Sequence, residues 1–215
     1  MTLFLLTLGT LGFYLLEHHN PATMGTLNAA GKFQAAFFQS VTTRTAGFAS
    51  ISQSGLTNGS KLLASMLMII GGSPAGTAGG IKTTTVAVLL LTAISVLRGN
   101  KDTECYGRKI TFEIIRVGIT ITLVTFVFWL FGVTVMTVIE PQQKVLDLMF
   151  EATSAMATVG LTVDLTPVLS DISHVVLMLM MYIGRIGPMT MALIFSGHVD
   201  KKNQFRTLPE AKIMV

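Results

Sequence analysis

The 215-residue sequence predicts an all-α integral membrane protein made of two repeats of one plan. Composition is the first reason, because charged residues make up 12% of the chain, about half the share of a soluble domain. The second reason is that the chain contains long runs with at most one charge each. A spanning helix needs about 20 apolar residues. We therefore expect four spanning segments, at 3–16, 62–97, 117–139 and 175–195.

The first of these runs has an alternative interpretation as a cleaved signal peptide. A signal peptide carries positive charge before its apolar core and a small-residue cleavage site after it. Residues 1–17 have neither feature. A short spanning helix therefore fits this run better.

The elements between the spanning runs follow one order in both halves. A short half-apolar helix is expected at 32–42 and again at 145–155, and each is followed by a tetrad of Thr, an apolar residue, Gly and an apolar residue. Gly47 and Gly160 lie 113 positions apart, and the same shift places Gly71 on Gly184. Several coincidences in one register indicate an internal repeat.

Charge distribution predicts the orientation in the membrane. Eight of the fifteen basic residues lie in the loop at 98–109 and its flanks or in the tail at 201–215. Basic loops stay on the cytoplasmic side, so both segments are expected there. Only two full crossings then separate them, at 117–139 and 175–195. The short helix between those crossings must therefore enter the membrane from outside and return. Nucleic-acid binding is not expected, because neither basic cluster is dense.

The tetrads suit the coordination of a dehydrated cation. Irregular backbone at membrane depth is tolerated where it lines a water-filled path. Glycine allows successive carbonyls to turn toward one axis, and carbonyl oxygens can replace the water shell of an ion. The tetrads 45–48 and 158–161 meet these requirements, and the C-terminal end of each short helix adds negative potential. The alternative is an ordinary turn after an amphipathic helix.

The second apolar run is expected to break at "GGSPAGTAGGIKTTT", residues 71–85. Its glycines and proline cannot continue a helix, and unwound backbone at this depth is typical of function in transporters. A phosphate-binding loop is disfavoured because Ile81 stands before Lys82, where a glycine is required. Arg185 lies in the last apolar run, where a charge needs partners. It is either a structural residue bonded to carbonyls or a residue just below the tetrads that faces the interruption. Arg44 is expected to point behind its tetrad, with Glu151 or carbonyls as its partner.

Several long motifs together resemble the Trk/Ktr/HKT superfamily of potassium and sodium transporters, and above all the membrane subunit of the bacterial Ktr system. These are "TTRTAGF" (42–48), "GGSPAGTAGGIKTTT" (71–85), "ATVGLT" (157–162) and "YIGRIGPMT" (182–190). The family fold has four membrane-pore-membrane (M1-P-M2) repeats around one pore. The two repeats here resemble the third and the fourth. The resemblance implies the carboxy-terminal half of a longer protein, or association of two copies.

The resemblance also implies roles for individual residues. Potassium would bind backbone carbonyls of Thr43, Arg44, Thr45, Ala46, Gly47, Met156, Ala157, Thr158, Val159 and Gly160. Gating would involve Gly71, Gly72, Ser73, Pro74, Ala75, Gly76, Thr77, Ala78, Gly79, Gly80 and Arg185. No cofactor and no enzymatic activity are expected.

The implied protein is a multi-pass transporter of the plasma membrane. Residues 1–97 and 114–200 would form the two pore repeats, 98–113 a cytoplasmic linker and 201–215 a cytoplasmic tail. Membrane lipid, a second full-length subunit and cytoplasmic RCK-type nucleotide-binding subunits are the implied partners. A non-conducting fragment or assembly partner, a solute-coupled carrier and a sodium-permeable or sodium-coupled member remain alternatives.

Overall fold

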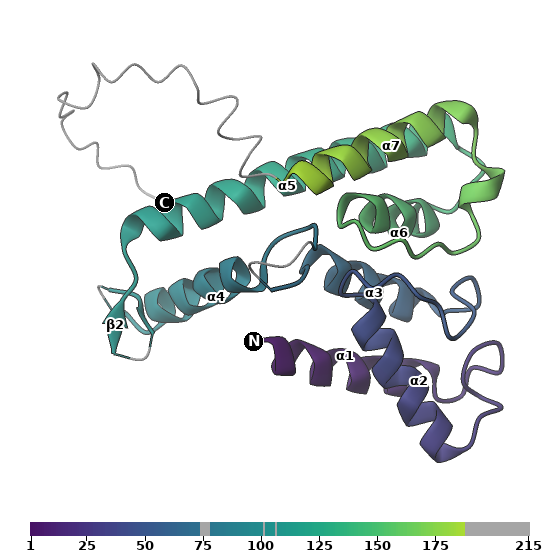
Figure 1. The fold of residues 1–215 in the computed structure, drawn as a ribbon, viewed down its shortest axis with the longest axis horizontal. Coiled ribbons are helices and arrows are strands. Elements are labelled where there is room, and N and C mark those ends of the chain that lie inside the picture. The colour runs from purple at the N-terminus through teal and green to yellow at the C-terminus, as the bar shows by residue number, and fades with distance from the viewer. Residues whose placement is uncertain (74–77, 101, 106, 188–215) are drawn as a thin grey trace.

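The structure is a computed structural model that describes residues 1–73, 78–100, 102–105 and 107–187. Within these residues the chain is predominantly helical, as the sequence predicts (Figure 1). The loops that join α2 to α3 and α6 to α7 gather at one end of the molecule. The connection from α4 to α5 lies at the opposite end.

The first repeat contains α1 (Thr2–Glu17), α2 (Ala29–Thr42), α3 (Asn58–Ile69) and α4 (Thr83–Leu97). The short helix predicted at 32–42 begins three residues earlier than expected. Asn28 explains this start, because its side-chain oxygen accepts a hydrogen bond of 2.8 Å from the backbone N–H of Gly31. Residues 83–85, predicted to belong to the interruption, instead form the first turn of α4.

The second repeat contains α5 (Phe112–Ile139), α6 (Val145–Met156), the 3₁₀ turn η1 (Thr166–Val168) and α7 (Asp171–Ile186). Helix α6 matches the predicted short helix within one residue. Helix α7 begins four residues before the apolar run, since Ser170 caps it by accepting a hydrogen bond from the backbone N–H of Ser173. The predicted end of this run, residues 188–195, lies outside the described residues.

The predicted spanning segments differ in their helical length. Within the described residues, α5 is the helix that is both long and apolar enough to cross a membrane by itself, with 28 residues and a mean hydropathy of 2.2. Helices α1 and α4 are apolar but shorter. The run at 62–97 is not one helix, because α3 ends at Ile69 and α4 begins at Thr83.

The linker between the repeats contains structure that the sequence did not predict. Strand β1 (Glu104–Cys105) pairs antiparallel with β2 (Arg108–Lys109). Gly107, just before β2, has a φ of 73°, which lies in the region that glycine adopts without strain. An ion pair of 2.6 Å between Asp102 and Lys109 also ties the hairpin.

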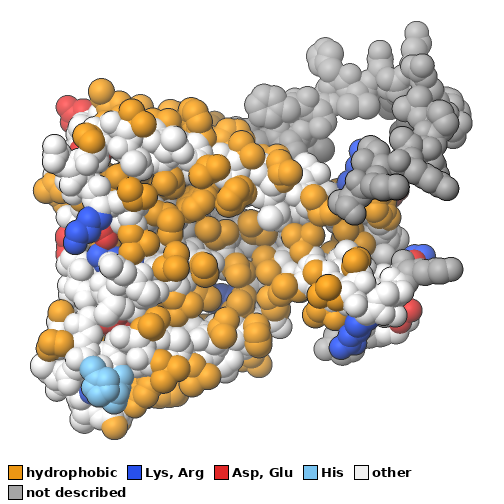
Figure 2. Space-filling view, turned by 180° about the vertical axis from the view of Figure 1, so that it is seen from behind, with side chains coloured by type: hydrophobic (Ala, Val, Ile, Leu, Met, Phe, Trp, Pro, Cys, Tyr) orange, Lys and Arg blue, Asp and Glu red, His pale blue; other side chains and the backbone are white. Residues whose placement is uncertain are grey.

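The core joins the two repeats where α6 packs against α3. Helix α2 packs against α1, whereas α6 packs against α3, α5 and α7. Large apolar side chains fill this core, among them Phe13, Met68, Met136, Leu148 and Phe150, all with 0% exposure. Hydrophobic side chains also cover the middle of the face in Figure 2, and charged ones gather toward its two ends. Such a surface suits a molecule whose middle lies in lipid.

A glutamate at the end of the first helix of each repeat caps the helix that follows the tetrad. Glu17 accepts hydrogen bonds from the backbone N–H and the hydroxyl of Thr57, the N-cap of α3, at 2.9 and 2.8 Å. Glu140 accepts from the backbone N–H of Ser170, the N-cap of α7, at 2.8 Å. Thr57 and Ser170 lie 113 positions apart, the separation of the tetrad glycines. The repeat therefore extends to the caps, which sequence comparison of the apolar runs missed.

Candidate functional site

Both tetrads adopt the same unusual backbone conformation. Thr45 and Thr158 have φ values of 68° and 55°, and Gly47 and Gly160 have φ values of 75° and 93°. A positive φ is strained for a β-branched residue such as threonine. Its occurrence at equivalent positions of both repeats indicates a shared backbone path that the surrounding structure enforces.

The two tetrads lie side by side, although 113 positions separate them in the sequence. A side-chain carbon added at Gly47 would collide with the backbone carbonyl oxygen of Val159. The next nearest atoms are the carbonyl carbon of Val159 and the Cα of Gly160, at 3.2 and 3.6 Å from the added carbon. Glycine at position 47 therefore lets the backbone of the first tetrad approach the Val159 carbonyl closely.

In the first repeat, side chains of α2 hold the backbone that follows the tetrad. The hydroxyl of Thr42 accepts a hydrogen bond from the backbone N–H of Phe48 at 2.8 Å and donates one to its carbonyl at 2.6 Å. One turn earlier, Gln39 exchanges two hydrogen bonds with Gln53, at 2.7 and 3.0 Å. Both glutamines are buried, so this pair fixes the chain from behind.

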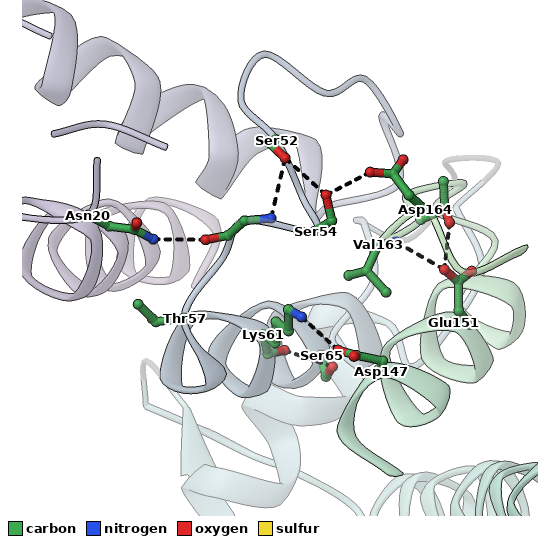
Figure 3. Close-up of polar contacts among 12 residues, drawn as sticks. Asn20, Ser52, Ser54, Thr57, Lys61, Ser65, Asp147, Glu151, Val163 and Asp164 are labelled. Atoms are coloured by element: carbon green, nitrogen blue, oxygen red, sulfur yellow. Dashed lines mark hydrogen bonds and ion pairs between the residues drawn. The ribbon is translucent and has the colours of Figure 1, made fainter. Parts of the chain in front are cut away.

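In the second repeat, α6 holds the equivalent backbone by different side chains. The hydroxyl of Ser154 accepts a hydrogen bond from the N–H of Gly160 at 3.2 Å. The buried carboxylate of Glu151 accepts from the N–H of Val163 at 3.0 Å and from the hydroxyl of Thr166 at 2.8 Å, as well as from Thr162 (Figure 3). Charge-assisted hydrogen bonds of this kind are strong, so the tetrad is held on a rigid support.

Two polar contacts tie the repeats together beside the tetrads (Figure 3). Lys61 of α3 forms an ion pair of 2.7 Å with Asp147 in the first turn of α6, and their side chains are only 9% and 20% exposed. The hydroxyl of Ser54 donates a hydrogen bond of 2.7 Å to Asp164. The first contact joins the helix after the first tetrad to the helix before the second, and the other joins the two segments that follow the tetrads. Their combined effect is to fix the separation of the two tetrads.

The interruption between α3 and α4 folds back against the second tetrad. The N–H of Ile81 donates to the carbonyl of Ile69 at 2.9 Å, which brings the two ends of the interruption together. The N–H of Gly79 donates to the hydroxyl of Thr158 at 3.0 Å. An added side-chain carbon at Gly79 would lie 2.8 Å from the carbonyl oxygen of Ala157. Four of the predicted gating residues, Pro74, Ala75, Gly76 and Thr77, lie outside the described residues.

The two arginines singled out in the sequence occupy different places. Arg44 donates to the carbonyls of Thr2 and Gly71, at 3.2 and 3.5 Å. Its expected direction toward carbonyls is thus observed, but Glu151 is not its partner, because that carboxylate is occupied by its own repeat. Arg185 lies in the last turn of α7, directly after Gly184. Gly184 approaches the carbonyl of Met156 so closely that a side chain would collide with it.

Among residues 1–73, 78–100, 102–105 and 107–187, no group of three or more His, Cys, Asp or Glu side chains could hold a metal ion. The adjacent His18 and His19 stack edge to face with ring centroids 4.6 Å apart.

Comparison with known proteins identifies the family. The family profile TrkH, described as a cation transport protein, matches residues 1–206. The chain belongs to the TrkH family of cation transport proteins. This family consists of membrane transporters rather than enzymes. The resemblance to the Trk/Ktr/HKT superfamily is therefore confirmed.

Several named relatives cover most of the chain. The Ktr system potassium uptake protein B of Bacillus subtilis (strain 168) is 38% identical over 195 residues, which are 91% of this chain and 44% of the relative. The protein of the same name from Vibrio alginolyticus is 38% identical over 192 residues, 89% of this chain and 42% of the relative. The potassium/sodium uptake protein NtpJ of Enterococcus hirae is 34% identical over 214 residues, which are 98% of this chain and 48% of the relative. The chain thus spans about half the length of these relatives.

A solved structure shares the TrkH fold. The crystal structure of the potassium transporter TrkH from Vibrio parahaemolyticus superposes with a TM-score of 0.73 at 17% sequence identity. The similarity covers 94% of this chain and 44% of that one. At this identity the comparison speaks for the fold, and it agrees with the membrane-protein class that the composition predicts.

Proposed function

We propose that this chain contributes two of the four backbone segments that line a potassium-selective path. The observation that carries the proposal is the pairing of the tetrads, with positive φ at Thr45 and Thr158 and with Gly47 against the carbonyl of Val159. Adjacent carbonyls held rigidly from behind are suited to replace the water shell of an alkali cation. Two segments cannot close a four-sided ring, so the path requires either a second copy or further repeats in the same subunit.

Potassium is the proposed ion because glycine occupies the third position of both tetrads and because two of the relatives are named potassium uptake proteins. Sodium permeation is the second candidate, since the 34%-identical relative NtpJ is named a potassium/sodium uptake protein. The ligands would be the carbonyls of the residues predicted above, from Thr43 to Gly47 and from Met156 to Gly160. Arg44 would contribute only its carbonyl, because its guanidinium is engaged with other carbonyls.

The interruption predicted at 71–85 is the proposed gate, and residues 71–73 and 78–85 are its described parts. Gly79 lies against the second tetrad and donates a hydrogen bond to Thr158, and this contact supports a loop that would obstruct an ion beyond the carbonyls. Its small residues allow it to swing aside at little steric cost. Arg185 would add an electrostatic barrier at the same level. Deletion of residues 75–80 should therefore raise cation flux.

The proposed whole transporter is a homodimer of full-length subunits in the plasma membrane. The loop at 98–109 and the tail at 201–215 would face the cytoplasm, where RCK-type nucleotide-binding subunits would dock. This part of the proposal is supported by the family membership and by the relatives named as parts of a Ktr system. No cofactor other than the transported ion is needed.

Cation uptake tests the proposal directly. A potassium-starved strain that expresses the chain should accumulate rubidium faster than one with an empty vector, and Gly47→Ser should weaken discrimination against sodium. The same substitution is introduced into a full-length relative, where the ring is complete. Unchanged selectivity in that complete pore would contradict the filter assignment. Loss of uptake by the chain alone, with altered selectivity in the relative, would identify the chain as a non-conducting half.

A further inference from the structure

A cavity of about 440 Å³ lies between α5 and the base of the second tetrad. Its outer wall is a single face of α5, formed by Thr122, Thr125, Phe126 and Trp129 at the spacing of successive helical turns. Its floor includes Gly80 and Ile81 of the interruption and Met156 and Ala157 at the end of α6. A volume of this size falls in the range of sites that bind small molecules.

The chemistry of the cavity is apolar, although three threonines line it. Each hydroxyl donates its single proton inside its own helix: Thr122 to the carbonyl of Gly118 at 2.9 Å, Thr125 to that of Ile121 at 2.8 Å, and Thr153 to that of Met149 at 2.6 Å. The indole N–H of Trp129 donates to the Thr153 hydroxyl at 2.8 Å. These four side chains have no donor left for a ligand, so the phosphate oxygens of a head group would find no hydrogen-bond donor among them.

The position of the cavity points to the bilayer as the source of its occupant. Thr122 to Trp129 occupy the middle of α5, the helix that is long enough to cross the membrane. Leu123 and Phe126, at its edge, are 59% and 55% exposed. The opening is therefore continuous with the apolar surface that α5 turns toward lipid, at a depth where acyl chains are the surrounding solvent.

We propose that this cavity binds one acyl chain of a membrane lipid, which enters beside α5 and lies against the interruption and the base of the second tetrad. The occupant is a hydrocarbon chain rather than a head group, because the site lies at mid-membrane depth and its hydroxyls and indole N–H are already bonded. Binding would remove apolar surface that the protein otherwise leaves unpacked, and filling such a void is favourable because its lining gains contacts. The proposal concerns lipid binding and does not depend on conduction.

Trp129 provides a direct probe, because it lines the cavity and is the only tryptophan of the 215 residues. The full chain is reconstituted in vesicles of dioleoylphosphatidylcholine and dioleoylphosphatidylglycerol, with or without bromine on the acyl chains. Bromine quenches tryptophan fluorescence at contact. We expect a large loss of Trp129 fluorescence in brominated vesicles, and a clearly smaller loss in Thr122→Phe, whose ring fills the cavity.

Thr120→Phe is the matched control, because Thr120 is exposed on the same helix and does not line the cavity. It should be quenched as strongly as the unchanged chain, and near-identical circular dichroism spectra exclude misfolding of either variant. Equal quenching of Thr122→Phe and the unchanged chain would overturn the proposal, since lipid would then reach the indole only from the surface. Absence of quenching in the unchanged chain would overturn it as well, because protein from a second copy or another segment would then occupy the cavity.

Discussion

The backbone N–H of Gly79 lies 3.0 Å from the hydroxyl oxygen of Thr158 and donates a hydrogen bond to it. Gly79 belongs to the interruption of the first repeat, whereas Thr158 begins the tetrad of the second. The backbone of Thr158 has a φ of 55°, and its hydroxyl is the group that contacts the interruption. One contact therefore couples the proposed gate to the proposed filter across the boundary between the repeats.

Replacement of Thr158 by valine tests this coupling. The substitution keeps the shape of the side chain and removes the hydroxyl, so the loop loses one hydrogen bond, worth about 1 kcal/mol. We expect rubidium flux to rise about fivefold, as the closed arrangement loses that stabilisation. Thr45→Val is the control, because it makes the same change at the equivalent position of the other tetrad. Equal flux in the two variants would contradict a specific contact between Gly79 and Thr158.

Alanine at the two tetrad glycines should have unequal effects. Both positions have positive φ, so either substitution introduces strain of about 1–2 kcal/mol. At Gly47 the new carbon also meets the carbonyl oxygen of Val159, whereas at Gly160 no atom lies within 4 Å. Gly47→Ala should therefore lower the thermal unfolding midpoint of the purified chain more than Gly160→Ala. Similar midpoints would show that the tetrads are further apart in the membrane.

The ion pair between Lys61 and Asp147 should contribute measurably to stability. Its partners are mostly buried, so the loss on Lys61→Met is expected between the values for exposed and for fully buried pairs, at about 2 kcal/mol. Lys109→Met breaks the exposed pair with Asp102 and should cost little. Urea titration of both variants measures the difference. An equal loss of unfolding free energy in Lys109→Met and Lys61→Met would argue against a stabilising role of the Lys61–Asp147 pair between the repeats.

The cap on α7 should make stability depend on pH. The hydroxyl and N–H of Ser170, followed by the hydroxyl of Ser173, hold the pKa of Glu140 below its ordinary value of 4.5. A depressed carboxyl pKa stabilises the fold above the unfolded value, and this contribution disappears as the pH falls through the folded pKa. The difference in unfolding midpoint between the unchanged chain and Glu140→Gln should therefore be constant near neutral pH and vanish in acid.

The same titration with Glu104→Gln, in the linker hairpin, provides the control for removing a carboxylate elsewhere. The same acid-dependent course in both variants would assign the effect at Glu140 to net charge rather than to the cap. A difference at Glu140 that grows as the pH falls below 4.5 would contradict the cap.

The sequence by itself determined the helical membrane class, the internal repeat and the family. These depend on apolar runs, on the spacing of Gly47 and Gly160 and on local motifs, all of which are properties of neighbouring residues or of a fixed shift. The apolar runs also predicted the ends of most helices within a few residues. Helices α2 and α7 begin earlier than predicted because their N-caps, Asn28 and Ser170, lie outside the apolar runs.

Only the tertiary structure decided which polar groups meet. The guess that paired Arg44 with Glu151 was wrong, because Glu151 is saturated by hydroxyl and N–H donors of its own repeat while Arg44 turns to carbonyls of α1 and the interruption. Likewise, nothing local in the sequence relates Lys61 to Asp147 or Gly79 to Thr158. Periodicity reports which face of a helix is apolar, whereas partner choice depends on how distant segments pack, and that is set by the fold as a whole.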